Sequence, residues 1–234
     1  MLKFEGCTFS AAGANKNAKV FGLTVDGSED VFVKNCTFDG TGYAAILNKG
    51  TGALTVEDCD FECGNIKNPI EGGQTADNGN VTVIGCDFVG VPGNNFINFY
   101  SVADGSVHTI KNCTFAGSTN NNIVRLSNKT NHAATFNIDD CSYKFVSGTA
   151  DEWTGFILCQ DYTNVSGNKQ DFSKYTVNIN NLDRPEEGSL IYVYEDGDGI
   201  IVTNYPAVTL DGSPLIFVSG DAGGDAMVED MEEE

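Results

Sequence analysis

A run of alternating acids, EDCDFE, is the stretch best suited to chemistry, because Asp58, Asp60 and Glu62 stand two residues apart. Two carboxylates on one face of a sheet can cleave a glycosidic bond, and a carboxylate cluster can hold Ca²⁺ while a basic residue removes a proton from an acidic polysaccharide. Nothing adjacent in the sequence supplies an acid with a raised pKa. We therefore expect none of the three to be catalytic and treat Asp60 only as part of a candidate ligand surface.

Basic and metal-binding groups are few, with two arginines and two histidines in the chain. Arg125, in IVRLSN, would need calcium-binding carboxylates near it to serve as a lyase base, and its own stretch has none. His108 occupies an apolar position and is expected to be packed, whereas His132 lies in a polar segment. The cysteines form no C-x₂-C pair, and Asp196–Gly199 lacks the distal acid of a calcium loop, so we expect neither metal nor cofactor.

One eight-residue pattern recurs along the first 143 residues, with Val31–Phe38 (VFVKNCTF) as its clearest copy. The other copies are LKFEGCTF (2–9), LTVEDCDF (54–61), VTVIGCDF (81–88), HTIKNCTF (108–115) and FNIDDCSY (136–143), with VNINNL (177–182) as a degenerate copy. The motif cysteines are Cys7, Cys36, Cys59, Cys86, Cys113 and Cys141, at intervals of 29, 23, 27, 27 and 28 residues. Such regular spacing predicts a solenoid.

The motif also predicts its own conformation. Apolar residues such as Val31 and Val33 alternate with polar ones, which indicates a strand with one face buried. Asn, Asp or Gly then precedes each cysteine, and these residues most easily adopt the left-handed backbone of a sharp corner. After the corner, cysteine and aromatic point inward while the residue between them points outward. The expected aromatic ladder is Phe9, Phe38, Phe61, Phe88, Phe115 and Tyr143, and Asp60 should lie beside Asp87 on the surface.

On these motifs the chain resembles the right-handed parallel β-helix proteins of the pectate-lyase-like superfamily, whose coils often carry an NCxF-like corner. The resemblance covers roughly residues 1–183 and implies an all-β, right-handed parallel β-helix of about six to seven coils. Lyases, hydrolases, adhesins and phage structural proteins share this fold, so it does not define a function.

The remainder of each coil is less regular. We expect second strands at 20–25, 43–47, 96–102, 123–126 and 155–162, joined by polar segments. Gly64–Asn80, the longest insertion of the regular part, is predicted to be a loop of the kind that carries a solenoid's binding surface. We expect the aromatic-rich segment Phe145–Lys174 to cap the end of the core. The alternative is that Trp153 and Tyr162 of this segment form an exposed platform that binds a sugar or a partner.

Beyond residue 183 the pattern changes. Residues 184–220 are predicted to form a small C-terminal β appendage or cap, with strands at 190–194, 199–203, 207–210 and 215–219. Residues 221–234 (DAGGDAMVEDMEEE) are too acidic to pack and are expected to be a disordered tail.

Charge limits the partners. Thirteen basic against 33 acidic residues give a formal charge of -20, which disfavours nucleic acid and anionic membranes. We see no signal peptide and no apolar run that could span a bilayer, and inward cysteines fit free thiols in a reducing compartment. The expected location is a virion that is assembled in the host cytoplasm, or otherwise the cytoplasm.

Two functions from different classes follow. The first is a non-enzymatic structural or binding protein, a phage capsid decoration or auxiliary protein or a tail-associated component, with virion proteins or further copies as partners; by resemblance a trimer is favoured. The alternative is a polysaccharide lyase, hydrolase or carbohydrate-binding β-helix that uses a groove along the rod with Asp58, Asp60 and Asp87, or the aromatic residues Trp153 and Tyr162. A host-surface adhesin is a third class, against which the missing export signal counts.

Overall fold

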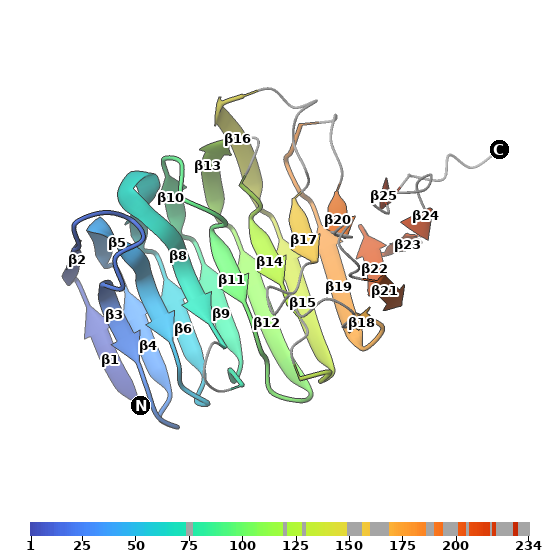
Figure 1. Cartoon of the computed structure of the whole chain (residues 1–234), viewed down its shortest axis with the longest axis horizontal. Coiled ribbons are helices and arrows are strands. Elements are labelled where there is room, and N and C mark those ends of the chain that lie inside the picture. The colour runs from blue at the N-terminus through green and yellow to red at the C-terminus, as the bar shows by residue number, and fades with distance from the viewer. Residues whose placement is uncertain are drawn as a thin grey trace.

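The computed structural model describes residues 1–73, 77–118, 121–127, 130–148, 156–159, 169–185, 190–193, 201–204, 206–215, 217–218 and 227–228. These residues form a parallel β-solenoid of about six turns (Figure 1). They contain no α-helix, and only η1 (Cys63–Asn65) is a 3-10 turn. Within this described part there is also no helix with the length and apolar character needed to cross a bilayer.

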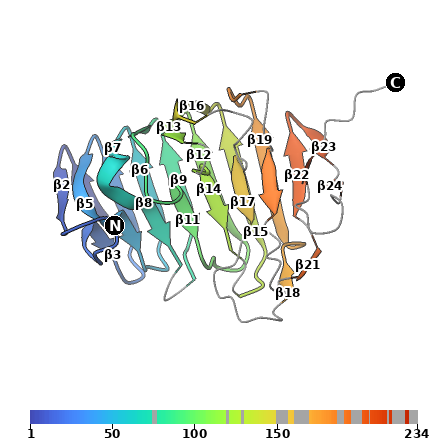
Figure 2. The same cartoon turned by 45° about the horizontal axis from the view of Figure 1, so that its top comes forward.

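The motif strands form one side of the solenoid, sheet A. Its neighbours are parallel from β1 to β22, and equivalent motif positions pair, as in Val31 with Leu54 and Leu54 with Val81. In spatial order the strands are β1 (Leu2–Glu5), β4 (Val31–Lys34), β6 (Leu54–Glu57), β9 (Val81–Ile84), β12 (Ser106–Lys111), β15 (Ala134–Asp139), β19 (Tyr175–Asn180), β22 (Ala207–Leu210) and the antiparallel β23 (Ser213–Leu215). Figure 2 shows these coils following one another in chain order.

Two further sides, sheets B and C, are joined through the long strand β5 (Thr37–Asn48). Sheet B also holds β2 (Thr8–Ala12), β7 (Asp60–Glu62), β10 (Asp87–Val89), β13 (Thr114–Ser118) and β16 (Ser142–Ser147). Sheet C also holds β3 (Phe21–Val25), β8 (Ile66–Gly72), β11 (Ile97–Phe99), β14 (Val124–Leu126), β17 (Ile157–Cys159) and β20 (Ile191–Val193).

The structure corrects the expectation for Gly64–Asn80. We predicted a loop, but residues 66–72 form β8, a strand of sheet C that pairs with β5 and β11. The sequence IKNPIEG lacks a clear alternation of apolar and polar residues, because polar Asn68 and Glu71 are buried as completely as its isoleucines. The pattern therefore resembled a polar connection.

The C-terminal strands continue the sheets. Strand β20 pairs in parallel with β17, and β22 pairs in parallel with β19. Sheet pairing thus crosses the boundary predicted at residue 184. Two small pairs complete the described part, β18 (Lys169–Asp171) with β21 (Ile201–Asn204) and β24 (Phe217–Val218) with β25 (Met227–Val228). Only residues 227–228 of the predicted tail are described.

The core between the sheets is built from stacked equivalents. Along sheet B, the ring of Phe61 stacks on Phe38 at 4.7 Å and on Phe88 at 4.5 Å between centroids, with the ring planes nearly parallel. Such pairs add about 0.5–1.5 kcal/mol each beyond the burial of their area. Phe156 and Phe172, from the segment predicted to be a cap, are fully buried. The inward ladders therefore fix the register of every coil.

Candidate functional site

The predicted acidic pair exists. Asp60 on β7 and Asp87 on β10 are register neighbours on the outer face of sheet B, and both side chains are exposed. The same row continues to Thr37 on one side and Thr114 on the other. The Thr114 hydroxyl donates a hydrogen bond to the Asp87 carboxylate. Neighbouring strands lie about 4.8 Å apart, a spacing comparable to the roughly 5 Å between the two carboxyl groups of retaining glycosidases.

The other acids of EDCDFE point to different surroundings. Asp58 occupies a corner with φ 52°, and its carboxylate lies 3.4 Å from the Lys34 ammonium. Glu57 also bonds this ammonium, and its hydrogen bond is the main cause that raises the pKa of Lys34. Glu62 is an exposed residue of β7, beside Val89 of β10. The three acids of the candidate cluster thus do not converge on one site.

The aromatic platform cannot be placed. Trp153 and Tyr162 lie outside the described residues. Asp196–Gly199 lies outside them as well. Among the residues that are described, no group of three or more His, Cys, Asp and Glu side chains could hold a metal ion.

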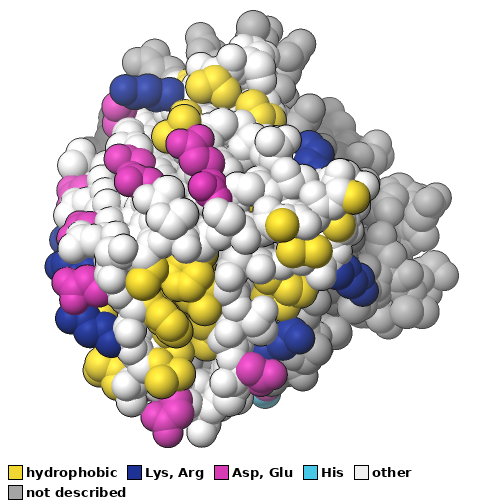
Figure 3. Space-filling view, turned by 90° about the vertical axis from the view of Figure 1, so that its left-hand side faces the viewer, with side chains coloured by type: hydrophobic (Ala, Val, Ile, Leu, Met, Phe, Trp, Pro, Cys, Tyr) yellow, Lys and Arg dark blue, Asp and Glu magenta, His cyan; other side chains and the backbone are white. Residues whose placement is uncertain are grey.

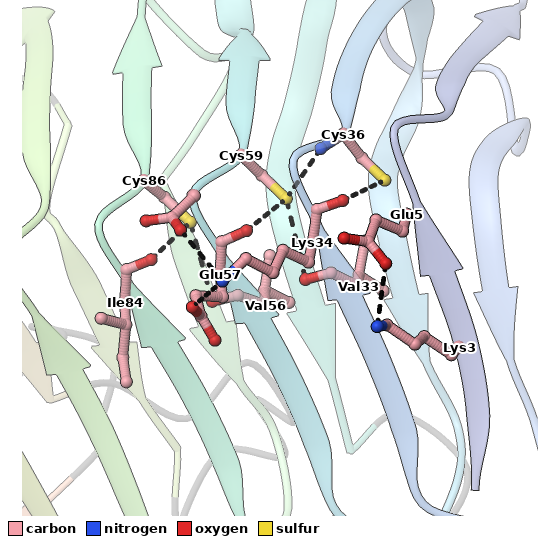
Figure 4. A network of polar contacts seen from close by, with 11 residues as sticks. Lys3, Glu5, Val33, Lys34, Cys36, Val56, Glu57, Cys59, Ile84 and Cys86 are labelled. Carbon is pink, nitrogen blue, oxygen red and sulfur yellow. Dashed lines mark hydrogen bonds and ion pairs between the residues drawn. The ribbon is translucent and has the colours of Figure 1, made fainter.

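The predicted thiol column is present (Figure 4). It is buried from its second member onward, whereas Cys7 in the first coil is half-buried. Cys36 Sγ lies 3.1 Å from the Lys34 carbonyl, Cys59 Sγ lies 3.2 Å from the Glu57 carbonyl, and the N–H of Cys36 donates to Cys59 Sγ at 3.4 Å. The same bond to the residue two positions earlier recurs at Cys86, Cys113 and Cys141.

These thiols serve the corners. Each corner residue has a left-handed φ, as at Asn35 (50°) and Gly85 (63°). The carbonyl before it accepts the N–H of the corner residue in the preceding coil, as Lys34 does from Gly6 at 3.1 Å, and the thiol two residues later is a second donor to that carbonyl. Burial raises the pKa of Cys36, and hydrogen bonding to Cys113 together with burial raises that of Cys141, whereas hydrogen bonds with neighbouring thiols lower the pKa of Cys59 and Cys113. From Cys36 onward the thiols are buried, so a reacting group has no access to them in either case.

A second polar row, which the sequence did not predict, runs across sheet C. Glu71 on β8 pairs with Asn98 on β11, and Asn98 pairs with Arg125 on β14. The ring of Phe99 packs against His108 of sheet A, so position 98 faces away from the core. All three side chains are nevertheless 0% exposed. We call Glu71, Asn98 and Arg125 the covered polar row.

The covered polar row holds two ionisable side chains, Glu71 and Arg125, that are buried although their positions face away from the core. Burial raises the pKa of Glu71 from its ordinary 4.5 to about 7, while a hydrogen bond from Asn68 and the charges of Lys67 and Arg125 oppose the shift. The Arg125 guanidinium lies 5.6 Å from the centre of the Tyr100 ring, within reach of a cation–π interaction. Oppositely charged groups are thus held two strands apart with an amide between them.

The histidines behave as expected from their positions. His108 is 1% exposed, accepts the Val81 N–H at Nδ1 (3.3 Å) and lies 2.9 Å from the Ser106 hydroxyl through Nε2. Burial lowers its pKa to about 3, so the ring is neutral and packed. His132 Nδ1 lies 3.0 Å from the Val102 carbonyl and 3.4 Å from the Asp77 carboxylate.

No protein-family model, curated protein or solved structure matches this chain. The resemblance to the pectate-lyase-like superfamily therefore rests on the repeated corner motif and on the parallel β-solenoid alone. The features that bear on function are the two polar rows and the ends of the rod.

The two rows differ in what they can do chemically. Asp60 and Asp87 are open to solvent and could bind a cation or a sugar hydroxyl, but one of them is tied to Thr114. Glu71 has the pKa that a general acid or base needs, yet its side chain has no accessible surface. Arg125, considered above as a lyase base, is buried in the same row, although a carboxylate does lie near it. The carboxyl group with the suitable pKa is therefore buried, and the carboxylates of the two rows that solvent can reach are Asp60 and Asp87.

Proposed function

We propose that this chain is a non-enzymatic structural or binding protein, and that it is a component of a phage virion, as a capsid decoration or auxiliary protein or a tail-associated protein. One observation carries the proposal: Glu71, a carboxyl group whose pKa is raised toward neutrality, is covered completely, while the exposed acids Asp60 and Asp87 lie on the outer face of sheet B. The rod thus provides stiffness and surface.

The virion assignment draws support from the thiol column. All eight cysteines are free, and seven of them are buried. Free thiols at every coil suit a protein that folds in a reducing cytoplasm, which is where virions assemble. Membership of the right-handed pectate-lyase-like superfamily belongs to the same proposal, supported by the NCxF-like corners.

Density-gradient centrifugation of virions from the source tests the assignment. We expect the chain to sediment with intact particles and to remain with them after a salt wash. Recovery only in the soluble fractions would overturn the virion role.

A second candidate, a polysaccharide lyase, hydrolase or carbohydrate-binding protein, is favoured by the adjacency of Asp60 and Asp87. Assays for reducing ends and unsaturated products over a panel of polysaccharides test it, with Asp60→Asn and Asp87→Asn as variants. Glu62→Gln is the matched control, because Glu62 is an exposed acid of the same strand outside the row. Turnover that Asp60→Asn abolishes and Glu62→Gln preserves would replace our first proposal.

A further inference from the structure

The first coil leaves core positions uncovered at one end of the rod. Leu2 is 55% exposed, whereas Val31, its register partner one coil later, is 5% exposed. Phe9 is likewise only partly buried, and its partner Phe38 is fully buried. We call the inward residues of the first coil the N-terminal end face; they are Leu2, Phe4, Cys7, Phe9 and Leu23. Figure 3 looks onto this end and shows apolar side chains gathered there, with charged groups mainly toward the margin.

Backbone groups are open at the same end. Strand β1 has β4 as its partner in sheet A and occupies the edge of that sheet. The N–H groups of Leu2 and Gly6 donate to the carbonyls of Asp30 (2.8 Å) and Lys34 (3.1 Å) of the second coil. Because alternate residues of a parallel strand bond in opposite directions, the N–H of Lys3 points to the open edge. An exposed edge of this kind is a template for another strand.

The opposite end of sheet A is closed differently. After β22 the chain turns through Asp211 (φ 48°) and Gly212 (φ 81°), and β23 pairs back antiparallel. Strand β23 is three residues long and contains Pro214, which cannot donate to a further strand. Short, proline-containing edge strands are a known means of preventing extension. The two ends of sheet A are thus unequal as docking surfaces.

Charge argues for the occupant. Residues 1–50 contain five lysines and five acidic residues, so the formal charge of -20 resides in residues 51–234. The last 50 residues contain thirteen acidic and no basic residues. The described strand β22 of this acid-rich stretch lies at the end of sheet A opposite β1, so stacking unlike ends of successive copies would set the acid-rich end against the next copy. Joining two N-terminal end faces places neutral surfaces together and keeps the acidic ends apart.

We propose that the N-terminal end face binds the same face of a second copy of this chain, forming a closed two-fold dimer. The two β1 edges run antiparallel across the junction, since only that two-fold arrangement keeps the core side of sheet A continuous. Leu2 and Phe4 of both copies become buried, and the contact is isologous, so it stops at two. The inference deepens the proposed structural role, on which it rests, by naming its assembly surface.

Sedimentation velocity of the full chain tests the dimer. We expect a species of twice 25.0 kDa that stops growing as the concentration rises and changes little with salt. Leu2→Asp should weaken association by about tenfold or more, because it buries an unpaired charge. Lys3→Pro should weaken it too, by removing the edge donor without touching the bonds from β1 to β4. The matched control is Val89→Asp, since Val89 is 52% exposed on the side of the rod.

Three results would overturn the closed dimer. They are a monomer at every concentration, continued growth into filaments, and equal effects of Leu2→Asp and Val89→Asp. Thermal melts show whether each variant is folded. A monomeric chain that still sediments with virions refutes the dimer alone. A dimeric chain absent from virions refutes the virion role alone.

Discussion

Sheets B and C carry polar residues in the same kind of row, one residue per coil on neighbouring parallel strands about 4.8 Å apart. In sheet B, Asp60 and Asp87 are exposed and their neighbours are hydroxyl residues. In sheet C, Glu71 and Arg125 are buried on either side of an amide. Exposure therefore determines the role of each carboxylate. Solvent screens Asp60 and Asp87, whereas the stability of the fold depends on the covered polar row.

The largest expected effect comes from removing the cation of the covered polar row. Arg125 is one of the largest fully buried side chains, so Arg125→Ala leaves a cavity in the row, and we expect the free energy of unfolding at neutral pH to fall by about 3–5 kcal/mol. Urea denaturation measures it. Lys111→Ala, at a partly exposed lysine of sheet A, is the control and should change stability by about 0.5 kcal/mol or less. Equal losses in both variants would remove the distinction between the rows.

Glu71→Gln tests the acid of the same row through pH. Because its folded pKa of about 7 lies above its ordinary 4.5, Glu71 adds stability below pH 4.5 that is lost as pH rises through 7. The stability of Glu71→Gln relative to the wild type should therefore increase by roughly 3 kcal/mol between pH 4.5 and 7 and then level off. Urea titrations across this range measure it, and the exposed Glu62→Gln controls for the loss of an acid. A flat difference would show that Glu71 is solvated.

A smaller effect is expected in the exposed row. Thr114→Val keeps the shape of the side chain but removes the hydroxyl that donates to Asp87, so stability should fall by about 0.5–1 kcal/mol. Thermal unfolding with Thr55→Val, on the outer face of sheet A, as control measures the difference. A loss as large as that of Arg125→Ala would mean that the sheet B row is structural after all.

Asp60→Asn should have the smallest effect. Removing one of two adjacent exposed carboxylates relieves repulsion in a chain of charge -20, so we expect a gain of a few tenths of a kcal/mol that disappears at high salt. Melting temperatures at low and high ionic strength measure it. A destabilised Asp60→Asn would indicate that Asp60 holds a partner.

Sequence predicted the motif side of the solenoid because the information there is local. Alternating residues such as Val31 and Val33 define the strand, and Asn35 and Cys36 define the corner within the same eight residues. Repetition then fixed the register, including the adjacency of Asp60 and Asp87.

The covered polar row was not predicted from the sequence because its signal is not local. Glu71, Asn98 and Arg125 are each 27 residues apart in the chain, and each looks like an ordinary surface residue in its own stretch. Their burial depends on neighbours from other coils, which a single sequence does not reveal. The equal spacing of a carboxylate, an amide and a guanidinium in consecutive coils is the signal that could have found them.

The hairpin of β22 and β23 sets the length of the rod, but nothing in the internal coils does. Each of them offers the same pair of edges to its neighbours, so duplicating the 27-residue unit from Cys86 to Asn112 would add a coil without new kinds of contact. Gene-level duplication and deletion could thus tune the reach of this protein in steps of one strand spacing while both ends keep their identities.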